Sequence, residues 1–271
     1  MKALYACMIV VCSMLSCKGY AEEIETVLLN IPLTFQHKVE VFVQKPEKSQ
    51  FPLLIFLHGA STDRGIKILS KDWLDVWVKK GYAVAAISMP GYGETTGRKD
   101  FCGPFTIKVL QFAIDAIKEQ LGVSDFGIIG FGQGGIAALL LAAKRADIRC
   151  LVCANGAYDL LSHLDTDDRL RQTLVVNNYA IALNANDFKV RSPLEYVSDI
   201  KSEVILLHRE ETPYFPLKEA AGFVEAMKRA GKECILSTLP PSSSTDENRR
   251  GIISYEEILL ETEEWIKARM Q

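Results

Sequence analysis

The stretch that decides the fold reads Phe126-Gly127-Ile128-Ile129-Gly130-Phe131-Gly132-Gln133-Gly134-Gly135-Ile136-Ala137. Its first half is an apolar run typical of a short buried strand, and the residues from Gly134 to Lys144 favour a helix. The glycines between the two halves predict a sharp turn that joins strand to helix directly. We expect Gly132 to lie at the point of this turn with a positive φ angle.

The spacing Gly130-x-Gly132-x-Gly134 matches the G-x-S-x-G nucleophile elbow, in which a strained serine stands at the top of a parallel sheet. Gly132 takes the place of that serine, and glycine has no side chain that could attack a substrate. Residues 130–135 also satisfy G-x-G-x-x-G, so dinucleotide binding at this loop is a remote alternative. Two features oppose it: the strand is the third parallel one, and Asn155 stands where an acid is expected.

The composition fits one ordinary globular domain. The chain has 271 residues, of which 48% are hydrophobic and 24% charged, so it can bury a sizeable core and is not a disordered chain. The formal net charge of −3 implies no basic face, and we expect no nucleic-acid partner.

The N-terminus has the pattern of an export signal. Lys2 precedes an apolar run over residues 3–15, and Gly19-Tyr20-Ala21 offers small residues for cleavage. We expect a signal peptide over residues 1–21, a single domain over residues 22–271, and a periplasmic or secreted protein. Lipoprotein processing at Cys17 is less favoured, because Met14 and Leu15 fit the pattern expected before a processed cysteine poorly. The run is too short for a transmembrane anchor.

Apolar runs alternate with helical patterns along the rest of the chain. This alternation predicts an α/β fold with a mostly parallel eight-stranded sheet, an antiparallel lead-in and helices on both faces. A charged segment at about 158–198 interrupts this alternation of strands and helices, and we expect it to form a small helical cap over the carboxyl ends of the strands. The expected strands are 25–33, 38–43, 53–57, 83–88, 127–131, 148–154, 204–208 and 233–238, and the expected helices are 72–79, 106–121, 134–144, 217–230 and 255–269.

The ordered set of motifs resembles the α/β-hydrolase superfamily, nearest to dienelactone-hydrolase and prolyl-oligopeptidase-like esterases. The set consists of His58-Gly59-Ala60-Ser61, then Pro90-Gly91-Tyr92-Gly93-Glu94, then the glycine-rich turn, and the resemblance covers about residues 25–270. It implies a serine, an acid and a histidine in that order, together with two backbone donors for an oxyanion. The resemblance assigns those donors to the amides of Ala60 and Gln133.

The triad that the resemblance implies is missing from the sequence. Gly132 replaces the serine, and Thr212, next to Glu211, stands in the place of the acid. The loop expected to carry the histidine includes Ser244 but no histidine, and none follows His208. We therefore expect a non-catalytic protein that binds a small acyl, carboxylate or peptide ligand, or a protein partner. The alternative is an atypical serine or cysteine hydrolase that uses relocated groups.

Several polar side chains are candidates for the pocket. A histidine in an H-G turn is usually structural, which is the favoured role of His58, whereas His163 in the expected cap could reach inward. Ser61 and Cys102 are possible substitute nucleophiles, although neither has an assignable base and acid. The four histidines lack the spacing of metal ligands, and we expect neither a metal nor a cofactor. The candidates are therefore His58, Ser61, Cys102, His163 and Glu211.

Four cysteines follow the expected signal peptide, and export would allow them to pair. Cys150 and Cys153 fall in one expected strand, where positions three apart point to opposite faces, so they should not bond to each other. We favour small buried hydrophobic roles for Cys102, Cys150, Cys153 and Cys234.

Overall fold

The computed structural model describes residues 26–31, 37–60, 64–163, 172, 174–175, 177, 179–210, 212, 216–242 and 252–271. Its strands are β1 (Val27–Ile31), β2 (His37–Gln44), β3 (Leu53–Leu57), β4 (Ala83–Ile87), β5 (Phe126–Phe131), β6 (Ile148–Ala154), β7 (Glu203–Arg209) and β8 (Cys234–Leu239).

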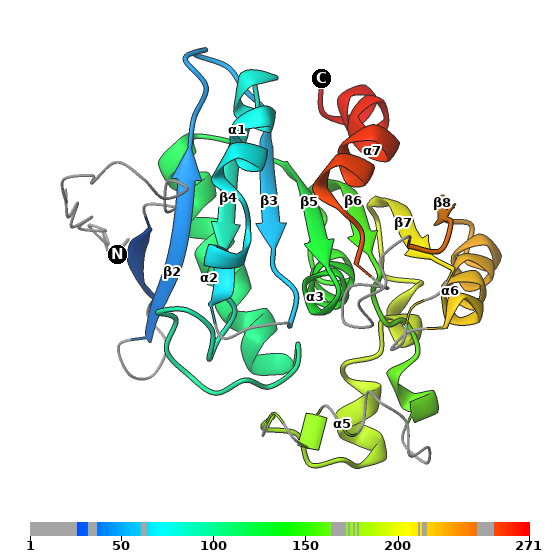
Figure 1. Cartoon of the computed structure of the whole chain (residues 1–271). Helices are drawn as coiled ribbons and strands as arrows, with labels where there is room; N and C mark the ends of the chain where they lie inside the picture. Colours follow the sequence, from blue (N-terminus) through cyan, green and yellow to red (C-terminus); the bar gives the residue numbers. More distant parts are fainter. Residues whose placement is uncertain are drawn as a thin grey trace.

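The strands form one sheet in the order β1-β2-β4-β3-β5-β6-β7-β8 (Figure 1). β2 pairs antiparallel with β1 and β4, and the other neighbours pair in parallel. The predicted eight-stranded, mostly parallel sheet with an antiparallel lead-in is confirmed.

Helices cover both faces of the sheet. α1 (Lys71–Lys79) and α7 (Tyr255–Met270) pack on one face, while α2 (Pro104–Leu121), α3 (Gln133–Ala142) and α6 (Leu217–Arg229) pack on the other. The predicted helices are therefore confirmed to within a few residues at each end. α7 begins with a capping box in which Ser254 and Glu257 each accept the other's backbone amide hydrogen bond.

The central strands are buried on both faces, which explains their continuous apolar runs. All five residues of β3 are buried, and successive side chains enter opposite cores. Cys150 lies in the core beneath α1 and α7, whereas Cys153 lies in the core beneath α2, α3 and α6. This confirms that the two cysteines face apart, and Cys102, Cys150, Cys153 and Cys234 are all free thiols.

The segment between β6 and β7 forms short helices beyond the carboxyl ends of the strands (Figure 1). They are η2 (Leu160–His163), α5 (Ala185–Lys189) and η3 (Pro193–Tyr196). Two contacts tie this segment to the loop after β4: the amide of Ala180 donates to Lys99 O at 2.7 Å, and Arg191 Nε donates to Asp100 O at 2.8 Å. The described part of the insertion is thus held over the end of the sheet where the glycine-rich turn lies.

The predicted signal peptide and the alternative processing site at Cys17 lie outside the described residues. Within the described ranges, no helix combines the length and the apolar character that crossing a bilayer requires.

Candidate active site at the strand-to-helix elbow

The turn between β5 and α3 has the predicted geometry. Gly132 is the N-cap of α3, with φ 50° and ψ −112°, and its amide donates to Ala154 O at 2.8 Å. β5 lies between β3 and β6, inside the sheet. The prediction of a tight turn with Gly132 at positive φ is confirmed. A non-glycine residue in this sparsely populated region stores about 1–3 kcal/mol of strain.

Gly130 and Gly134 must be glycine because a side chain would not fit there, whereas the space around Gly132 would admit one. A Cβ atom at Gly134 would lie 2.2 Å from Leu57 O, and one at Gly130 would lie 2.4 Å from Gly134 O. At Gly132 the nearest such atom is Asn155 O, at 4.0 Å. The turn therefore leaves room for a side chain at Gly132, the place to which the resemblance assigns a nucleophile.

Gln133 and Ala60 are the two residues expected to donate backbone hydrogen bonds at this turn. Gln133 is the first residue of α3, so its amide has no acceptor within the helix. Ala60 follows the turn at Gly59, where a Cβ atom would lie 3.4 Å from Phe131 O, so this turn packs against the elbow. A helix N-terminus also favours an anion or a developing negative charge.

His58 is a structural residue in this site. Its side chain is fully buried, and the amide of Met89 donates to Nε2 at 2.9 Å. Since Nε2 accepts, the proton is on Nδ1, which donates to Gly59 O at 2.8 Å. Burial lowers the pKa of His58 to about 4, so the ring is neutral at pH 7. Both nitrogens are engaged, and the ring joins the ends of β3 and β4 instead of facing Gly132 as a free base.

Of the two proposed substitute nucleophiles, Cys102 is the one that lies within the described residues. Its buried thiol donates to Gln133 O at 3.1 Å, and Phe101 and Cys102 both have positive φ angles, 49° and 60°. Burial holds the pKa of this thiol well above its ordinary value, so it is protonated at pH 7. A protonated, buried thiol is a poor nucleophile.

His163 lies in the insertion and its side chain contacts Glu219 of α6. Its Nε2 lies 2.5 Å from Glu219 Oε1, and Glu219 Oε2 accepts from the amides of Tyr158 and Asp159 at 3.2 and 3.4 Å. This cluster ties η2 to the start of α6. Thr212, in the place of the acid, follows β7, whereas Ser61, Glu211 and Ser244 lie outside the described residues.

A buried polar cluster beside the elbow was not anticipated from the sequence. Gln133 Oε1 lies 3.0 Å from the hydroxyl of Tyr92 and 3.1 Å from that of Tyr179, and the two hydroxyls are 2.5 Å apart. One signal pointed to it: Gln133 is the only polar side chain in the wholly buried helix α3, and a buried amide needs partners. Tyr179 itself lies in the insertion, where no periodic pattern marks it.

A family described as alpha/beta hydrolase fold matches residues 52–192, which include β3, the elbow and part of the insertion. The chain belongs to this family. The chain is thus related to peptidases and esterases, and the matched residues include the turn at Gly132. This membership, together with the turn's place in the sheet, favours the elbow over a dinucleotide-binding loop. A dinucleotide-binding loop would need an acid at position 155. The residue there is Asn155, whose Oδ1 accepts a hydrogen bond from the amide of Arg209 at 3.0 Å.

The curated relatives that align over about three quarters of the chain are longer proteins. The uncharacterized peptidase YuxL of Bacillus subtilis is 24% identical over 209 residues, which are 74% of this chain and 32% of that protein. The chain thus spans about a third of the length of this relative.

Solved structures show the same fold. An acylaminoacyl peptidase of Pyrococcus horikoshii superposes with a TM-score of 0.72 at 18% identity, over 92% of this chain and 42% of that one. Est1E of Butyrivibrio proteoclasticus superposes with a TM-score of 0.66 at 17% identity, over 86% of this chain and 96% of that one.

Proposed function

We propose that this protein binds a small acyl, carboxylate or peptide ligand at the elbow and does not hydrolyse it. The observation that carries the proposal is Gly132, which keeps the backbone angles of a nucleophile turn and faces open space but has no side chain. The amides of Ala60 and Gln133 would bind the carbonyl or carboxylate oxygen of the ligand. Binding needs these donors, whereas acyl transfer also needs a nucleophile and a base.

The two candidate histidines of the pocket are both engaged in other contacts, which supports the proposal. His58 has both ring nitrogens engaged, and His163 pairs with Glu219 at the insertion. The sequence has no histidine after His208, which removes the family's usual base. A serine, even if present, has a high pKa and requires a base to accept its proton.

The relatives suggest the class of ligand. One acylaminoacyl peptidase structure holds Z-Gly-Gly-Phe-chloromethyl ketone, and Est1E holds ferulic acid. Both molecules carry an aromatic ring joined through two carbon atoms to a carbonyl or carboxyl carbon. From the pattern of residues 1–21, we further propose that the protein meets its ligand after export.

An atypical hydrolase is the second candidate, and membership of a family of peptidases and esterases favours it. It would require Cys102 or Ser61 to act as nucleophile. The raised pKa of the buried Cys102 thiol weighs against the first of these.

The test is to titrate the wild-type protein with N-acetyl-L-phenylalanine ethyl ester by calorimetry and to recover the ester afterwards. We expect saturable binding and an intact ester, because the donors remain and the nucleophile does not. Saturable turnover that is lost in Cys102→Ala or Ser61→Ala would establish the hydrolase instead. Absence of binding to this ester, its amide and its acid would contradict a ligand site at the elbow.

A further inference from the structure

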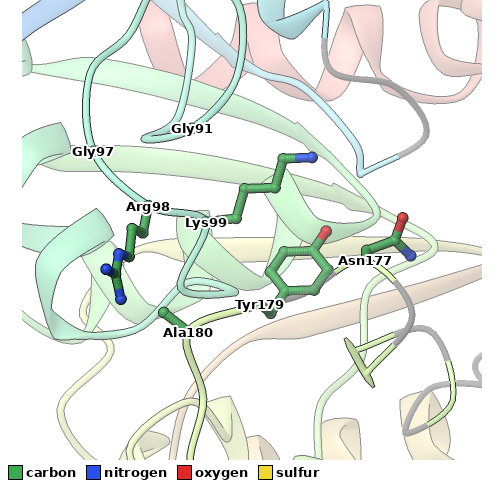
Figure 2. Close-up of a pocket in the computed structure, with 7 residues that line it drawn as sticks. All are labelled: Gly91, Gly97, Arg98, Lys99, Asn177, Tyr179 and Ala180. Atoms are coloured by element: carbon green, nitrogen blue, oxygen red, sulfur yellow. The ribbon is translucent and has the colours of Figure 1, made fainter.

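A cavity of about 510 Å³ opens between the loop after β4 and the insertion. Its volume lies within the roughly 300–1,000 Å³ typical of small-molecule sites. None of the described residues that line it is acidic, and two are cationic. They are Gly91, Gly97, Arg98, Lys99, Asn177, Tyr179 and Ala180 (Figure 2).

Lys99 is the cation directed into this cavity. Its ammonium lies 4.7 Å from the centroid of the Tyr92 ring, a cation–π contact that holds the side chain inward. Figure 2 shows Lys99 extending toward the side on which the Tyr179 hydroxyl and the Asn177 amide lie, while Arg98 points the other way. The hydrogen bond from the Ala180 amide to Lys99 O fixes the two segments against each other.

Tyr179 connects the cavity to the elbow and can donate a hydrogen bond to a ligand. Its hydroxyl is 3.1 Å from Oε1 of Gln133, the residue after Gly132. Each tyrosine hydroxyl has one hydrogen, so only one of the two can donate to Gln133 while they also bond to each other. If Tyr92 donates to Gln133, Tyr179 can turn its hydrogen from the Tyr92 oxygen to an anion. This exchanges the hydrogen bond between the two hydroxyls for a charge-assisted one, and the buried Gln133 oxygen keeps its partner.

We propose that this cavity binds an oxyanion group of the ligand, a carboxylate or a phosphate. Lys99 supplies the charge, and the Tyr179 hydroxyl and the Asn177 amide supply hydrogen bonds. The inference rests on the proposed function for the position of the rest of the ligand, which would extend from this cavity toward Gly132. The site would then select acids over their neutral analogues.

The experiment compares N-acetyl-L-phenylalanine with its amide, which has the same shape without the charge. We expect the wild-type protein to bind the acid about tenfold more tightly than the amide, because a charge-assisted contact is lost with the amide. Lys99→Met should abolish this preference. The matched control is Lys108→Met, which removes the same charge from an exposed position of α2 and should keep the preference. Tyr179→Phe should weaken acid binding by a smaller factor.

Inorganic phosphate, added as a competitor, distinguishes the two oxyanions. Displacement of the acid from the wild type means that the site takes phosphate as well, and no displacement restricts it to carboxylates. Equal affinity for acid and amide, or a preference that survives Lys99→Met, overturns the inference. If the amide and the ester bind without any preference for the acid, the proposed function stands and only the anion site fails. If Lys99-dependent acid binding occurs while neither neutral analogue binds, the anion site stands and binding at the elbow fails.

Discussion

Gly134→Ala is expected to lower the free energy of unfolding by about 3 kcal/mol or more, the upper end for overpacking a buried site. The new Cβ atom would lie 2.2 Å from Leu57 O and 2.7 Å from His58 O. Both neighbours are backbone atoms at the end of β3, so no side-chain rotation relieves the clash. Either β3 or the first turn of α3 must shift, and the change in the urea midpoint measures the cost.

The matched control is Gly222→Ala in α6. This glycine is exposed within the helix, and a Cβ atom there meets nothing within 4 Å. Replacing it should raise stability by about 0.5–1 kcal/mol, since alanine loses less backbone entropy in a helix. If Gly134→Ala unfolds at the same urea concentration as the wild type, α3 does not pack as closely on β3 at the elbow as described.

Arg209→Met is expected to cost about 2–3 kcal/mol, less than for a fully buried ion pair, because the Glu257 carboxylate left behind is 33% exposed. The guanidinium of Arg209 is 4% exposed at the end of β7 and forms two hydrogen bonds, 2.7 and 2.6 Å, with the Glu257 carboxylate. It also donates to Pro240 O at 2.6 Å and Ile252 O at 3.2 Å. Desolvation raises the pKa of Glu257, but the bonds from Arg209 and Ser254 outweigh it, so that pKa lies below its usual value.

These contacts join β7, the end of β8 and the start of α7. The loops in which the resemblance implies an acid and a histidine follow β7 and β8. Arg149→Met is the control, because Arg149 is mostly exposed and pairs with Asp125 at the surface. An exposed pair contributes at most about 1 kcal/mol. Equal small losses for the two variants, measured by urea unfolding, would contradict the structural role of Arg209.

The fold could be predicted because its signals are local. The apolar run of β3 and the one-sided pattern of Trp73 and Trp77 in α1 each report burial within a few residues of sequence. The turn at Gly132 could be predicted for the same reason, since its geometry depends on adjacent glycines.

The polar surroundings of the elbow could not be predicted in this way. Tyr179 and Gln133 are 46 residues apart, and only the path of the insertion brings them together. The inward position of Lys99 likewise depends on the ring of Tyr92 and on the backbone contact with Ala180. His58 could be assigned a structural role from its H-G turn, but its partner Met89 follows from the pairing of β3 with β4.

We propose that this chain lacks a catalytic base as well as a nucleophile. Gly132→Ser would place a hydroxyl in the open space at the elbow, next to the amide of Gln133. The strained backbone should cost about 1–3 kcal/mol. Gly122→Ser is the matched control, because Gly122 also has a positive φ, 67°, and open surroundings but lies at the far end of α2.

The decisive measurement is the initial rate of p-nitrophenyl acetate hydrolysis by Gly132→Ser, with Gly122→Ser and the wild type beside it. We expect all three rates to equal the uncatalysed rate, because His58 and His163 are both engaged and the sequence has no histidine after His208 that could accept the proton of the introduced serine. Saturable turnover by Gly132→Ser alone would contradict the account. It would mean that a base already stands at the elbow and that only the serine has been lost.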